Sequence, residues 1–144
     1  MWQSAYPVIA RNLWRHYGDK VVLRTHWKSL NDFMAYIERT STDGLNLLGG
    51  LSDWVPPGGN GHGIPTPAPE TSAFYGLLDI HHMAEMATAI DEVADAAKYG
   101  QMLAAGKIAY HKKFYDPKAK VYGKGSQCSA MMSGHRTDRI HRTD

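Results

Sequence analysis

An all-α fold is predicted by three features of the sequence. Four segments carry apolar residues at three-to-four-residue spacing, which is the period of a helix with one buried face. Short turns join these segments in pairs, and one long loop rich in Gly and Pro separates the two pairs. The 144 residues are 43% hydrophobic and 21% charged, which is the composition of a single globular domain and not of a disordered chain. We therefore expect two helical hairpins.

The first pair of predicted helices covers residues 5–16 and 20–39. Gly18 is expected to end the first helix in a left-handed conformation, and Asp19 is expected to cap the start of the second. The second helix carries a wide apolar stripe, so we expect it to be buried on two sides.

The second pair of predicted helices follows a long loop at residues 40–69. Loops of this length inside a domain are usually functional or disordered. The third helix is predicted over residues 70–90 and the fourth over residues 91–115, where Asp116 and Pro117 stop it.

The end of the chain departs from this helical pattern. Val121 and Tyr122 are predicted to form one short strand, and residues 126–132 the start of a fifth helix. Residues 133–144 are polar, repeat His-Arg-Thr-Asp, and are predicted to be a disordered tail. The helical domain is thus expected to cover residues 1–132, with an abrupt start and end typical of a piece of a longer protein.

Composition excludes several classes of protein. A net charge of +2 is too small to indicate binding to nucleic acid or to an anionic membrane surface. No run approaches the roughly 20 apolar residues of a transmembrane helix, and no signal peptide is visible at the start. The single Cys128 excludes an intrachain disulfide. We expect a cytoplasmic protein with no nucleic-acid or membrane partner.

The first candidate for function is the pair Asp53 and Trp54 in the long loop. A carboxylate accepts protons from sugar hydroxyls, and an indole packs on the C–H face of a sugar ring. The alternative is that Trp54 fills a core and Asp53 caps a turn.

Five motifs then follow one another in a recognisable order and spacing. They are Trp2-x-x-Ala5-x-Pro7, Tyr17-Gly18-Asp19, Asp53-Trp54, Thr71-x-Ala73-x-Tyr75 and Gly125-Ser126-Gln127. Together they resemble the catalytic domain of bacterial α-L-rhamnosidases over about residues 2–131. Ser52 stands where the family has Gly, Cys128 stands where it has Thr, and after Met132 the polar tail replaces an apolar helix.

The resemblance implies a fold and a function. The fold would be part of a six-hairpin (α/α)₆ barrel, and Asp53 with Trp54 would line the pocket of an enzyme that removes terminal rhamnose from glycosides. Such enzymes use two carboxylates, one as acid and one as base. In the family, these lie before and after the residues matched here, so the chain is expected to bind a carbohydrate or glycoside without ordinary rhamnosidase activity and without a cofactor.

A metal-dependent helical enzyme is the alternative function. His81 and Glu85 share one helix face at i,i+4, and Asp79 and His82 share another at i,i+3. With His111 from the fourth helix, the set His81, His82, Glu85 and His111 could hold a divalent transition metal. The other interpretation of this cluster is a solvated helix face.

Self-association is also expected. A twelve-helix barrel would cover both sides of each hairpin, and four helices leave apolar surface without that cover. We therefore predict a homo-oligomer.

Overall fold

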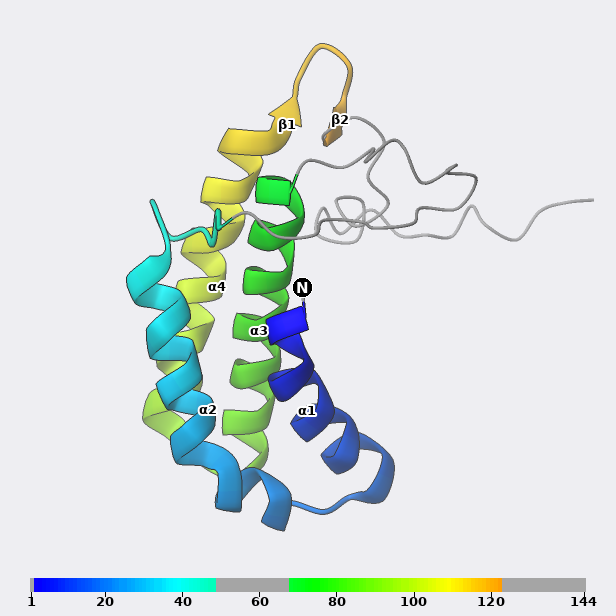
Figure 1. Ribbon diagram of the computed structural model, residues 1–144, viewed down its shortest axis with the longest axis vertical. Coiled ribbons are helices and arrows are strands. Elements are labelled where there is room, and N and C mark those ends of the chain that lie inside the picture. The colour runs from blue at the N-terminus through cyan, green and yellow to red at the C-terminus, as the bar shows by residue number, and fades with distance from the viewer. Residues whose placement is uncertain (1, 49–67, 123–144) are drawn as a thin grey trace, which may run out of the picture.

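Helix α3 is the central element of the structure, and the other three helices pack around it (Figure 1). The structure is a computed structural model, and it describes residues 2–48 and 68–122. A 3₁₀ turn, η1 (Trp2–Ser4), leads into the four helices, which are α1 (Ala5–Tyr17), α2 (Val21–Thr40), α3 (Ala68–Ala89) and α4 (Val93–Phe114). Two short strands follow, β1 (Tyr115–Asp116) and β2 (Val121–Tyr122). The predicted all-α class with helical hairpins is confirmed for this part of the chain.

The join between α1 and α2 forms as the sequence predicts. Gly18 adopts φ +71° and donates its backbone N–H to Trp14 O at 2.8 Å, which ends α1. The Asp19 carboxylate accepts the N–H of Val21 at 2.7 Å, so it satisfies one of the free donors at the start of α2. Local residue chemistry therefore decides this turn.

The start of α4 lies two residues later than predicted. Asp91 has φ +66°, a left-handed conformation that an α-helix does not contain, so the turn from α3 ends only at Glu92. The end of α4 also differs by one residue, because Tyr115 pairs with Tyr122 in the antiparallel β1–β2 ribbon. The ribbon turn is held by the Asp116 carboxylate, which accepts the N–H of Lys118 at 2.8 Å.

The core runs along α3 and not along α2. Helix α3 has buried residues on all sides and is therefore the central helix of the group. Buried residues on α2 instead form one stripe, and they are Leu23, Trp27, Leu30, Met34 and Ile37. The expectation that α2 is buried on two sides is therefore wrong, because three residues that widen its apolar stripe are not buried: His26 is exposed, and Val22 and Phe33 are only partly buried.

Helix α1 carries three exposed large apolar side chains, more than any other described helix. Ile9 is 57% exposed, Leu13 is 40% exposed and Tyr17 is 79% exposed. The predicted homo-oligomer stays a prediction, and the surface that motivates it moves from α2 to α1.

Several predictions fall outside the described residues. These are most of the long loop, the start of a fifth helix and the polar tail at residues 133–144. Within the described residues, no helix is both long and apolar enough to cross a membrane.

Candidate functional site

The two predicted sugar-binding residues, Asp53 and Trp54, lie outside the described residues. The chain on either side of them is described: it leaves α2 through a turn at residues 42–45 and enters α3 at Ala68. The end of α2, the start of α3 and the end of α4 lie at the same end of the helices (Figure 1). The described residues that flank the predicted sugar-binding pair therefore lie at this end of the molecule.

A buried carboxylate occupies the first turn of α3 at this end. Glu70 is 2% exposed, and Tyr110 Oη of α4 donates to its Oε1 over 3.5 Å. The Tyr110 ring packs against Phe114 and Tyr122, with centroids 4.8 Å and 5.9 Å apart. A negative charge in the first turn of a helix is stabilised by the helix dipole. Glu70 therefore joins the start of α3 to the end of α4.

His111, one of the predicted metal ligands, belongs to the aromatic cluster beside the β1–β2 ribbon. Its Nδ1 lies 2.6 Å from Tyr122 Oη, at hydrogen-bonding distance. Its ring stacks on Tyr115 with centroids 4.5 Å apart. These contacts hold the end of α4 to the ribbon.

The other predicted metal ligands lie lower on α3, facing α1. Arg11 Nε donates to Glu85 Oε2 at 2.5 Å, and this hydrogen bond holds the pKa of the Glu85 carboxyl below its usual range. His81 Nε2 is 3.9 Å from Glu85 Oε1. Because Arg11 already neutralises Glu85, that carboxylate is poorly suited to bind a cation.

The structure does not bring His81, His82, Glu85 and His111 together as one ligand set. In the described ranges, no three His, Cys, Asp or Glu side chains are grouped so that they could hold a metal ion. The described residues therefore do not support the alternative function as a metal-dependent enzyme.

The interface between α1 and α3 contains two buried polar residues. Asp79 is 2% exposed; Ser4 Oγ donates to its Oδ2 at 2.7 Å, while its Oδ1 has no hydrogen-bond partner within the described part of the chain. His82 is 7% exposed, and its Nδ1 also has no partner there. The interpretation of this cluster as a solvated face is thus wrong for these two residues.

Burial changes the charge of both side chains. It raises the pKa of Asp79 from 3.8 to about 7, although the Ser4 hydrogen bond opposes the rise. It lowers the pKa of His82 from 6.5 to about 4, and the nearby Arg11 cation lowers it further. The sequence did not reveal Ser4 and Arg11 as partners of α3. The one pattern that could have indicated this is the seven-residue spacing of Ser4 and Arg11, which places both on the same face of the first helical turns.

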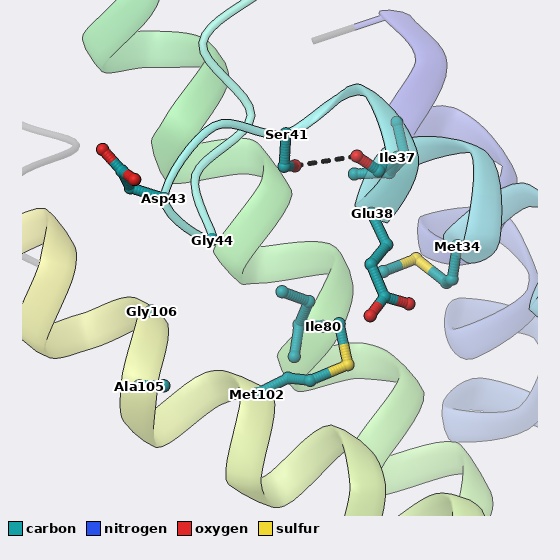
Figure 2. Close-up of a pocket in the computed structure, with 10 residues that line it drawn as sticks. All are labelled: Met34, Ile37, Glu38, Ser41, Asp43, Gly44, Ile80, Met102, Ala105 and Gly106. Atoms are coloured by element: carbon teal, nitrogen blue, oxygen red, sulfur yellow. Dashed lines mark hydrogen bonds between the residues drawn. The ribbon is translucent and has the colours of Figure 1, made fainter.

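A cavity opens between α2 and α4, with α3 as its floor. Its volume is about 320 Å³. Figure 2 shows the apolar side chains of Met34, Ile80 and Met102 around it, with the Glu38 carboxylate directed into the same space. The remaining lining residues are Ile37, Ser41, Asp43, Gly44, Ala105 and Gly106. No pattern in the sequence predicts this cavity, because it depends on how far apart two non-consecutive helices lie.

A comparison with known protein families identifies the family of this chain. Residues 1–134 match the family described as the bacterial alpha-L-rhamnosidase 6 hairpin glycosidase domain. The chain belongs to this family. The predicted resemblance is thereby confirmed, and the hairpins α1–α2 and α3–α4 agree with a domain built from helical hairpins.

A solved structure supports the same assignment. The α-L-rhamnosidase from Dictyoglumus thermophilum aligns with a TM-score of 0.77 and 26% sequence identity, over 90% of this chain and 15% of that one. The chain thus spans less than a sixth of the length of this rhamnosidase. A comparison with curated protein sequences found no match.

Family membership gives a context to the two ends of the helices. In the sequence, the segment with Asp53 and Trp54 connects the two hairpins of this α-L-rhamnosidase-type domain. The end of α2 and the start of α3, which flank it, lie at the end of the helices where Glu70 and the aromatic cluster lie. The α1–α3 interface lies along the sides of the helices, whereas the cavity is bordered by Asp43 and Gly44 of the turn through which the chain leaves α2.

Proposed function

We propose that this chain contributes part of the sugar-binding surface of a glycoside hydrolase that acts on α-L-rhamnosides. The observation that carries the proposal is the family match over residues 1–134, together with the similarity to a solved α-L-rhamnosidase.

Asp53 and Trp54 are the residues proposed to contact the sugar. An ionised Asp has only acceptor oxygens, so it suits the hydroxyl donors of a sugar. The Trp indole offers a large apolar face for the C–H side of the ring and a single N–H donor at its edge. Their place between α2 and α3 supports the proposal, since binding residues often lie in loops positioned by a rigid scaffold.

We further propose that the isolated chain binds a rhamnoside but does not turn it over at an ordinary rate. Glycosidases of this kind position a carboxylic acid and a carboxylate on either side of the scissile bond. A positioned acid or base contributes roughly 10²–10⁴-fold each. The resemblance implies that both groups belong to segments outside residues 1–144.

Two measurements on the purified chain test the proposal. L-Rhamnose is expected to shift the indole N–H signal of Trp54 in an NMR titration, and Asp53→Ala is expected to abolish that shift. Asp32→Ala is the matched control, because Asp32 is an exposed carboxylate on α2 whose contact is a surface ion pair with Lys28. No shift of Trp54 at millimolar rhamnose would refute sugar binding at this pair.

Turnover is measured separately with an aryl rhamnoside. Background rates in the wild-type chain agree with the proposal. A rate typical of a glycosidase that persists after repurification and is lost in Asp53→Ala would show instead that the chain carries its own acid and base.

A further inference from the structure

The cavity between α2 and α4 has the size and shape of a small-molecule site. Ligand pockets are typically about 300–1,000 Å³ and mainly apolar, with few polar groups. The volume here is about 320 Å³. Since an engineered apolar cavity of roughly 150 Å³ holds benzene, this one has room for an aromatic ring and a short side chain.

Its position follows from how α2 and α4 are joined. Towards the start of α4, Trp27 Nε1 of α2 donates to Asp95 Oδ2 at 2.8 Å, and Tyr99 Oη donates to Asn31 Oδ1 at 2.5 Å. These bonds connect the two helices directly. Towards the end of α2, residues Asp43 and Gly44 of the following turn border the space between the two helices in place of such hydrogen bonds. The cavity opens there, above Ile80.

The floor of the cavity favours an aromatic ring. Met34 and Met102 face the space from opposite helices, with Ile80 between them (Figure 2). Thioether sulfur makes favourable contacts with aromatic rings, and the flexible Met side chain adapts to an irregular ligand. A ring placed here contacts sulfur from both walls.

The rim of the cavity favours a positive charge. Glu38 points into the cavity, and Asp43 adds a second carboxylate at its edge, although that side chain points away from the centre (Figure 2). Lys98 Nζ is the cation near them, 3.7 Å from Glu38 Oε2. It is 46% exposed and Glu38 is 54% exposed, so this ion pair is weak and is readily exchanged. Among the described residues that line the cavity, the two charged ones, Glu38 and Asp43, are both acidic.

We propose that this cavity binds a small aromatic ammonium ion, with the ring on Met34, Ile80 and Met102 and the ammonium group beside Glu38. This proposal rests on described residues of α2, α3 and α4, whereas the rhamnoside proposal rests on Asp53 and Trp54, so the two are tested separately. An amphipathic cation of this kind satisfies the apolar floor and the acidic rim together.

Phenethylamine and 2-phenylethanol are the matched probes, because they differ only in the charged group. Ring currents from a bound aromatic group are expected to move the NMR signals of the Met34 and Met102 methyl groups, while Met83 and Met86, buried in the core, stay unchanged. The amine is expected to bind roughly threefold more tightly than the alcohol at low salt, and added salt is expected to reduce the difference.

Three variants locate the site. Ala105→Trp fills the cavity and is expected to abolish the Met34 and Met102 shifts with both probes. Ala104→Trp lies at the neighbouring exposed position of α4, outside the lining, and is expected to leave these shifts intact. Glu38→Gln is expected to remove the preference for the amine while keeping the binding of the alcohol. Unchanged circular dichroism and unchanged Met83 and Met86 signals show that each variant is folded.

Other results would overturn the proposal. These are the absence of Met34 and Met102 shifts at millimolar amine, equal affinity for amine and alcohol in the wild type, or normal amine binding in Ala105→Trp. Equal affinity would mean a neutral aromatic occupant. None of these results bears on sugar binding, which is read at Trp54.

Discussion

Helix α3 forms two interfaces of opposite character, one with α4 and one with α1. Against α4, α3 lies so close that a Cβ atom added to Gly106 would come within 2.3 Å of Leu77 Cδ2. Against α1, the same helix presents Asp79, His82 and Glu85, and two of these are buried polar residues. Around Gly106 and Leu77 the α3–α4 interface depends on shape, whereas the α1–α3 interface contains groups whose charge is costly to bury. We therefore expect stability to respond to pH through Asp79 and His82, and to side-chain volume through the close contact at Gly106.

The largest effect is expected from removing the charge at Asp79. Its folded pKa of about 7 lies above the ordinary 3.8, so between these values the folded chain keeps a proton that the unfolded chain has released. Stability is therefore full at low pH and is lost as pH rises towards 7. Asp79→Asn is expected to be more stable than the wild type at pH 8 by roughly 2–3 kcal/mol, after about 1 kcal/mol for the unpaired amide.

Urea denaturation at pH 4 and pH 8 measures this effect. The stability difference between variant and wild type should shrink towards pH 4. A difference that is the same at both pH values would mean that folding does not raise the pKa of the Asp79 carboxyl.

The next effect breaks the α3–α4 interface. Gly106→Ala is expected to destabilise the chain by about 1–3 kcal/mol, because the new methyl group overlaps Leu77, which is 1% exposed and has little room to move. Gly100→Ala in the same helix meets no atom within 4 Å and is expected to stabilise by up to ~1 kcal/mol. The change in the free energy of unfolding should be independent of pH for both variants. Equal effects of the two variants would contradict the close approach at Gly106.

A second pH effect, opposite in sign to that of Asp79, is expected from His82. Its folded pKa of about 4 lies below the ordinary 6.5, so the unfolded chain takes up a proton first as pH falls. The contribution of neutral His82 to stability is therefore lost between pH 6.5 and 4, by roughly 2 kcal/mol. In the wild type this loss opposes the gain from protonated Asp79, so His82→Leu should leave only the Asp79 dependence, with stability rising as pH falls from 6.5 to 4. A stability difference between His82→Leu and wild type that stays constant over this range would contradict the lowered pKa of His82.

The smallest effect on stability is expected on the outward face of α1. Tyr17 is 79% exposed, so Tyr17→Ser should change the free energy of unfolding by less than ~0.5 kcal/mol. If this face holds copies of the chain together, the substitution will nevertheless lower the molecular mass seen by light scattering at micromolar concentration. A wild-type chain of 16.0 kDa in solution would contradict the predicted homo-oligomer.

The local chemistry of the sequence determined where the helices begin and end. Gly18 and Asp19 settle the first turn because a left-handed glycine and a short carboxylate act on backbone groups a few residues away. The stripe on α2 likewise predicted Leu23, Trp27 and Leu30 as buried. The order of the motifs also predicted the family, since it requires no knowledge of packing.

Tertiary structure alone decided which helix is central and which polar groups are buried. Periodicity shows that a helix has an apolar face, but it does not show which neighbour covers that face. The second helix was therefore expected to be buried on two sides, whereas α3 is the helix with buried residues on all sides. Ser4 meets Asp79 across 75 positions of the chain, and the cavity forms where α2 and α4 diverge over Ile80. The free energy of a buried charge depends on everything packed around it, and those surroundings are assembled from segments that lie far apart in the sequence.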